Sequence, residues 1–113
     1  MQIIKDISIK ELQELAGNLF GDMIKAVIDI RQGLVVVDAE LHADEEESLL
    51  EQGSKQEDLW GFNLYPEDFG TDDFIEFDSI INIRPRQNNR SRSVDNAEVR
   101  EKIKSIVEEI VHE

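Results

Sequence analysis

The sequence IKAVIDIRQGLVVVDAEL, residues 24–41, decides the fold, because apolar residues alternate with more polar ones on both sides of Gln32-Gly33. Such alternation predicts two half-buried strands, and a two-residue turn with Gly33 at positive φ would join them as a hairpin. This register gives one wholly apolar face, whereas a slip by one residue would set acidic residues against it. The predicted pairs are Ile30 with Val35, Ile28 with Val37, Ala26 with Ala39, and Ile24 with Leu41.

A helix is predicted on the N-terminal side of this hairpin. Ser8 and Glu11 have the spacing of a capping box, in which each side chain bonds to the main chain of the other residue. Apolar residues then recur at helical spacing up to Phe20. We expect Gly21 to end the helix in a left-handed conformation.

Two further helices are predicted on the C-terminal side of the hairpin. Asp44 is expected to cap the first of them, with Glu47 three residues later and Gly53 at its end. Asp95 and Glu98 have the same capping spacing, just before a long apolar stripe.

A second pair of strands is predicted between these two helices. Trp60, Phe62 and Leu64 alternate along a strand near residues 58–65, and residues 74–84 are rich in β-branched and aromatic side chains. The predicted order is therefore α-β-β-α-β-β-α. It indicates an α+β fold with a four-stranded, largely antiparallel sheet and helices mainly on one of its faces. We expect one domain over residues 1–113.

The composition excludes several classes of function. The chain has a formal net charge of −14, no cysteine, and no apolar run of the ~20 residues that would span a bilayer. Disulfides, thiolate catalysis and cysteine-bound metals are thereby excluded. We expect a soluble cytoplasmic protein without a membrane segment. Binding to duplex nucleic acid is not expected, because that affinity depends on cations that displace counterions.

Four arginines interrupt this acidic chain within residues 84–92, a segment without any acid that we call the arginine loop. Their planar guanidinium groups match carboxylates and phosphates. Two interpretations stay open: the arginines pair with the acids of the same molecule, which is the commoner arrangement, or they bind a foreign anion. In the second case the chain is a non-catalytic binding or regulatory module, and a small anionic ligand is one partner. The candidate anion-binding residues are Arg84, Arg86, Arg90, Arg92, Asn82 and Asn89.

Two alternative functions follow from the acidic residues. His42 lies close to Asp44, Glu45 and Glu47, which would suit a small metal-dependent hydrolase, although no histidine pair has the spacing of a metal motif. The weak metal candidates are His42, Asp44 and Glu47, and we predict no cofactor. A solvated helix start explains these carboxylates better than a metal site does. The third alternative is an acidic interaction module that binds a basic protein.

Several strings in the chain are specific rather than generic: ELHADEE at 40–46, EQGSKQEDLWG at 51–61, NLYP at 63–66, FIEFDS at 74–79, INIRP at 81–85 and NRSR at 89–92. Together they resemble a small prokaryotic family that is known only as a domain of unknown function. The resemblance covers nearly the whole chain and implies a free-standing prokaryotic domain. It brings no activity, cofactor or catalytic residue with it.

Overall fold

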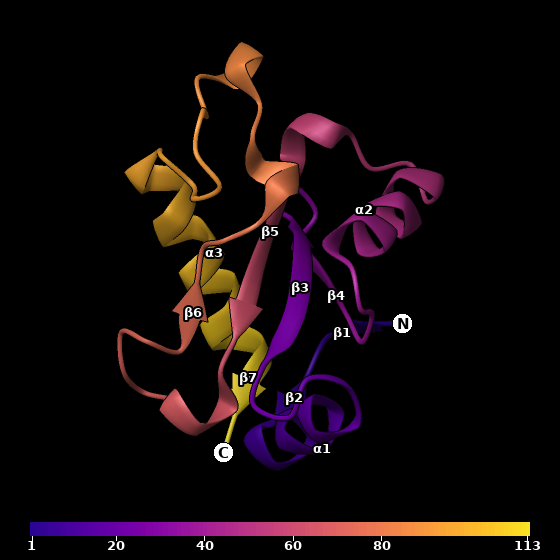
Figure 1. Cartoon of the computed structure of the whole chain (residues 1–113), viewed down its shortest axis with the longest axis vertical. Helices are drawn as coiled ribbons and strands as arrows, with labels where there is room; N and C mark the ends of the chain where they lie inside the picture. Colours follow the sequence, from indigo (N-terminus) through magenta and orange to yellow (C-terminus); the bar gives the residue numbers. More distant parts are fainter.

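A five-stranded antiparallel sheet forms the centre of the computed structural model, which describes all 113 residues (Figure 1). The sequence predicted four strands. The additional strand is β1, an N-terminal segment that extends the free edge of β4. The fold is α+β with three long helices, as predicted. The strands, in spatial order, are β1 (Gln2–Ile4), β4 (Leu34–Val37), β3 (Ile24–Asp29), β5 (Leu59–Leu64) and β6 (Ile75–Glu76).

The hairpin of β3 and β4 has the predicted faces but a register shifted by two residues. Ile28 pairs with Val35 instead of Val37, and the connection is a four-residue loop, residues 30–33. The reason is Asp29, whose carboxylate accepts the Arg31 amide at 2.9 Å and thereby closes a longer turn. Gly33 has φ +72°, the positive value expected of it. A shift of two preserves the side-chain alternation, so the predicted apolar face is buried.

The helices cover both faces of the sheet. Helices α1 (Ile9–Leu19) and α3 (Ala97–Ile110) share the larger core with the apolar face of the hairpin. Helix α2 (His42–Glu51) packs its Leu49 on the other face, against Val27, Val36 and Leu59. Figure 1 shows α3 behind the sheet and α1 at its lower end, with α2 well apart from both.

The first predicted helix cap is confirmed, and the other two are wrong. Ser8 and Glu11 form the capping box, and Gly21 follows α1 at φ +93°. Helix α2 begins at His42 without a side-chain cap, so Asp44 lies inside its first turn. Asn96 caps α3 in place of Asp95, because the Asp95 carboxylate turns back to accept bonds from the arginine loop.

Short elements complete the structure. Strand β2 (Ile7–Ser8) pairs in parallel with β7 (Val111–His112), which joins the two ends of the chain. Much of the predicted second strand over residues 74–84 forms irregular structure, with a 3₁₀ turn, η3, at Ile80–Asn82. Three more such turns are η1 (Gln56–Asp58), η2 (Pro66–Asp68) and η4 (Pro85–Gln87). None of the helices combines the length and apolar character that would let it cross a membrane.

Candidate functional site: the arginine loop

The edge of β5 explains where the arginine loop begins. On the side away from β3, β6 pairs only with the last two residues of β5, which leaves the main chain of Gly61 without a strand partner. The Asn82 side chain takes that place: its Nδ2 donates to Gly61 O at 2.9 Å, and its Oδ1 accepts from Gly61 N at 2.8 Å. Glycine is needed here, because a Cβ at position 61 would lie 2.7 Å from Ser79 Oγ.

Arg84 continues this edge and is already engaged. Its guanidinium group donates to the main-chain oxygens of Gln56 and Leu59, and its Cζ lies 4.1 Å from the centroid of the Trp60 ring. Burial lowers the pKa of Arg84, while the nearby Glu46 carboxylate acts in the opposite direction. Arginine stays charged in either case. Arg84 therefore clamps η1 to β5 and brings a positive charge to this end of the molecule.

The tip of the arginine loop is held in one shape. Arg84 and Asn89 form an isolated antiparallel bridge, with an N–O distance of 2.7 Å in one direction and 3.2 Å in the other. Asn88 adopts the left-handed conformation inside this bridge. The Gln87 side chain donates to Glu57 O at 3.0 Å, which ties the tip to η1. The loop is thus ordered before any ligand arrives.

The buried amide of Asn89 supports the loop from inside. It donates to Asn82 O at 2.8 Å and to Ser93 O at 2.7 Å. Asn82 and Asn89 are both almost fully buried, and their amides are used within the protein. These two candidate residues shape the loop and do not offer free donors to a ligand.

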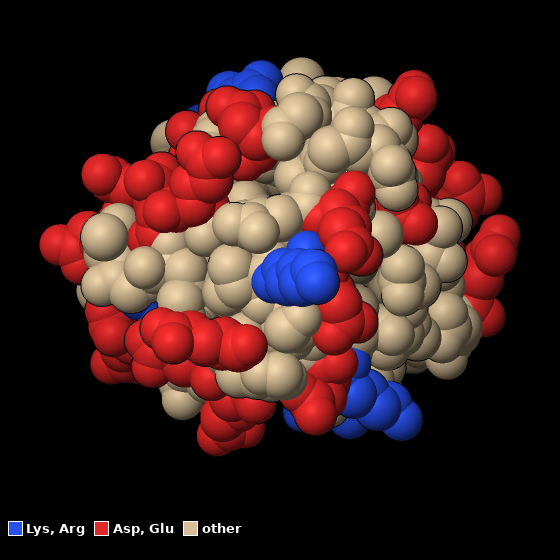
Figure 2. Space-filling view, turned by 90° about the horizontal axis from the view of Figure 1, so that it is seen from below, with Lys and Arg blue, Asp and Glu red and all other residues tan.

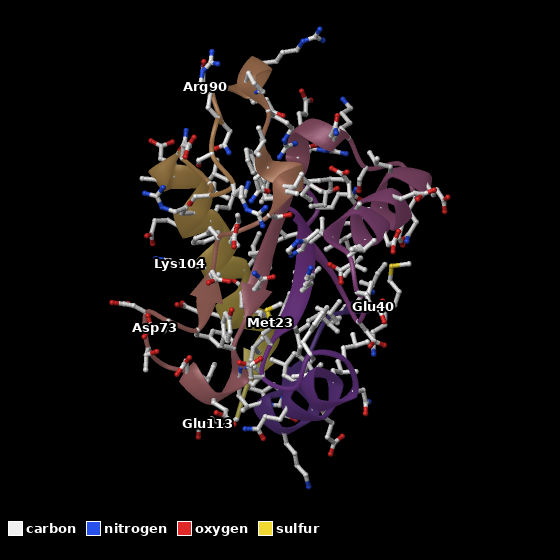
Figure 3. All side chains as sticks on the ribbon, in the orientation of Figure 1. Met23, Glu40, Asp73, Arg90, Lys104 and Glu113 are labelled. Carbon is white, nitrogen blue, oxygen red and sulfur yellow. The ribbon has the colours of Figure 1, made fainter.

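The other three arginines differ in their surroundings. Arg92 pairs with Asp78, with an Nε–Oδ1 distance of 2.5 Å. Arg86 and Arg90 are exposed, and neither forms an ion pair or a side-chain hydrogen bond. Figure 3 shows Arg90 at the end of the molecule farthest from Glu113. Each interpretation of the loop therefore describes part of it: Arg92 is paired internally, whereas Arg86 and Arg90 are free.

An open groove of about 750 Å³ runs along one side of the loop. Lys55, Arg84 and Arg86 give it three positive charges against one carboxylate, that of Glu57. A smaller cavity of about 430 Å³ lies on the other side of Gln87 and contains Glu57 and Asp95, with no cation. An anion would therefore enter the first groove. Its remaining lining residues are Gln56, Ile83, Pro85 and Gln87.

The opposite end of the molecule is rich in acidic side chains. Figure 2 shows that end, and acidic side chains cover much of it with few basic ones between them. The arginine loop lies at the other end of the long axis (Figure 1). The arginine loop and its groove therefore lie away from this acidic face.

The alternative site around His42 is not assembled. His42 is buried and donates from Nε2 to Phe62 O at 2.8 Å, and burial lowers its pKa. Asp44 and Glu47 are exposed, and no group of three or more histidine or acidic residues is placed to hold a metal ion. Glu45 lies on the buried face of α2, and burial raises its pKa to about 9. This geometry gives the hydrolase alternative no support.

One of the two segments that line the groove could not be found from the sequence. Lys55, Gln56 and Glu57 face the arginine loop across a gap of nearly thirty positions, and no motif links the two segments. One signal was available: Trp60 is the only tryptophan, and a nearby arginine is a frequent stacking partner for that ring.

Comparisons with known proteins locate the chain in one family. No curated protein and no solved structure matches it. A family model described as "Protein of unknown function (DUF5674)" matches residues 1–110, which confirms the resemblance seen in the sequence strings. The chain therefore belongs to the DUF5674 family of proteins of unknown function.

Proposed function

We propose that the protein is a non-catalytic binding module whose arginine loop holds an anionic group of its ligand. One observation carries the proposal: the guanidinium groups of Arg86 and Arg90 have no carboxylate partner, although the chain has more than twice as many acidic as basic side chains. An ordered loop that keeps two guanidinium groups free is suited to bind an anion with little further loss of entropy.

The groove indicates where that anion would bind. Lys55 and Arg86 border it from opposite sides, and Arg84 adds charge at its wall. Three cations around one cavity attract a carboxylate or phosphate even in a protein of negative net charge, because the local field dominates at short range.

An NMR titration with inorganic phosphate and pyrophosphate at low salt tests the proposal. We expect amide shifts in residues 84–92 and at Lys55, and we expect Arg86→Gln with Arg90→Gln to abolish them. Lys10→Gln in α1 removes the same kind of charge from an exposed position elsewhere and should leave binding unchanged. Absence of shifts in the arginine loop, or equal losses in both variants, would contradict an anion site here.

The acidic end suggests a second candidate function, which is the binding of a basic protein partner. The face in Figure 2 is rich in carboxylates, and such a surface steers a basic partner at low salt. Co-purification from native lysate at low and high salt would test it. A basic partner that salt releases supports this function, and a protein recovered alone at both salt concentrations counts against it.

A further inference from the structure

We propose that the groove binds an extended segment of a protein partner, and that this segment carries both carboxylates and aliphatic side chains. The inference rests on the proposed function and names the class of its ligand. It follows from three features: the openness of the groove, the exposed apolar residues in and before it, and the engagement of the main-chain oxygens of Gln56, Glu57 and Leu59 by side chains of the arginine loop.

The lining of the groove does not suit a small metabolite. Pockets for small molecules are concave and mostly apolar, with a few polar groups. Here the groove is open to solvent, and seven of its eight lining residues are not hydrophobic. Its lining comes from two separate segments, residues 55–57 and 83–87, so the groove lies between η1 and the arginine loop. An open groove of this kind accommodates a chain more readily than a compact ligand.

One exposed aliphatic side chain lies in the groove, and another is exposed in the turn that precedes it in the chain. Ile83 lines the groove with 44% of its surface exposed, and Ile80 in the preceding η3 turn is 68% exposed. Pro85 is exposed between Arg84 and Arg86. Apolar residues gathered beside arginines are typical of protein interfaces, where the apolar surface is covered and the charges lie around it. A free phosphate would use the cations and leave these residues uncovered.

The surroundings of Trp60 argue against single-stranded nucleic acid. Such ligands stack their bases on exposed aromatic rings. Trp60 is only 4% exposed and lies beneath Arg84, and no aromatic residue lines the groove. The net charge of −14 would further oppose a polyphosphate.

The main chain beside the groove offers few free acceptors for recognition by strand addition. The main-chain oxygens of Gln56 and Leu59 already accept from Arg84, and that of Glu57 accepts from Gln87. Asn82 occupies the main chain of Gly61 at the same edge. A bound segment must therefore be recognised by side chains: its carboxylates by Lys55 and Arg86, its aliphatic groups by Ile83. This mode resembles the recognition of acidic motifs by arginine clusters.

Fluorescence anisotropy with a short labelled peptide of glutamate, leucine and glycine tests the inference. We expect Arg86→Gln to weaken peptide binding about fivefold or more, as for loss of a partly exposed charge pair. Ile83→Ser should weaken peptide binding by a similar factor but leave the affinity for inorganic phosphate unchanged. A peptide with serine in place of leucine should bind the unaltered protein about as weakly as the leucine peptide binds the Ile83→Ser variant. Lys10→Gln is the control for charge, and circular dichroism checks that each variant is folded.

The possible outcomes separate the inference from the proposed function. If phosphate binds in the arginine loop but the peptide binds no more tightly than its serine version, the anion site stands and the peptide inference is wrong. If the peptide binds but Arg86→Gln and Ile83→Ser have no effect, the groove is not its site. Tighter binding of a short RNA than of the peptide would also overturn the inference. If neither phosphate nor peptide binds, both proposals fail.

Discussion

Replacement of Glu45 by glutamine should make the protein more stable at neutral pH. Glu45 is fully buried on the inner face of α2, and neither carboxylate oxygen has a hydrogen-bond partner of good geometry. Burial raises its pKa from 4.5 to about 9, and the Ala39 main chain, Lys25 and the N-terminal amino group only partly oppose this. At pH 7 the folded protein must therefore keep a proton on Glu45 that the unfolded chain releases.

The size of this effect follows from linkage between protonation and folding. The pKa is raised, so the folded state binds the proton more tightly. The stability from this group is complete below about pH 4.5 and falls by about 1.4 kcal/mol per pH unit up to about pH 9. At pH 7 the loss is about 3 kcal/mol. Glutamine has nearly the same shape as glutamate and cannot ionise, so it avoids this loss of stability. The buried amide without hydrogen-bond partners would itself cost ~1–2 kcal/mol, which reduces the net gain.

Urea unfolding between about pH 5 and about pH 8, followed by the fluorescence of Trp60, measures the difference between the two proteins. We expect the free energy of unfolding of Glu45→Gln, relative to that of the unaltered protein, to rise steadily with pH. Any cost of the buried amide is constant over this range and does not change this trend. His42 contributes equally to the pH dependence of both proteins, so its contribution cancels when their free energies of unfolding are subtracted. Glu47→Gln, an exposed neighbour on the same helix, is the matched control and should change stability by less than ~0.5 kcal/mol. A difference that does not vary with pH would show that Glu45 ionises normally and would refute the reasoning.

Three further substitutions test the support of the hairpin and the loop. Gly61→Ala should lower the free energy of unfolding by ~2 kcal/mol in denaturant experiments, because the new Cβ would lie 2.7 Å from Ser79 Oγ; unchanged stability would mean that the loop is not packed on β5. Asp29→Asn should cost ~2 kcal/mol near neutral pH, and a thermal melt should show the difference shrinking in acid. Burial acts to raise the pKa of Asp29, but its hydrogen bonds outweigh this and lower it, so its stabilisation is lost as pH falls through that value. Arg84→Lys keeps the charge but loses the planar stack, so the emission of Trp60 should shift; an unaltered spectrum would contradict the stacked arrangement.

Local rules were enough to predict much of the fold. The capping box of Ser8 and Glu11, the positive φ of Gly33 and the two faces of the hairpin each depend on residues close together in sequence, and all are confirmed. The register was wrong because Asp29 bonds to the main chain of the turn, a choice that alternation alone does not reveal. The strand β1 was missed because three residues at an edge carry too weak a pattern.

The candidate site could be predicted only in part, and for a similar reason. The cluster of arginines was visible, but its division into clamped, paired and free members depends on distant partners. Arg84 bonds to the main chain of residues 56 and 59, which no side-chain pattern could indicate. The burial of Glu45 was equally hidden, since a helix start rich in carboxylates is usually solvated.

The open edge of β5 links the structure of the arginine loop to its proposed use. A further strand along this edge would have satisfied the main chain of Gly61 and Leu59, but the side chains of Asn82 and Arg84 do so instead. The chain after Arg84 is then free to leave the sheet, and the bridge to Asn89 turns it back within a few residues. Arg86 is exposed at the tip, where its guanidinium group forms no ion pair. The free charge is therefore a consequence of how the sheet edge is closed, and any change that releases Asn82 or Arg84 from β5 should weaken anion binding without touching Arg86 itself.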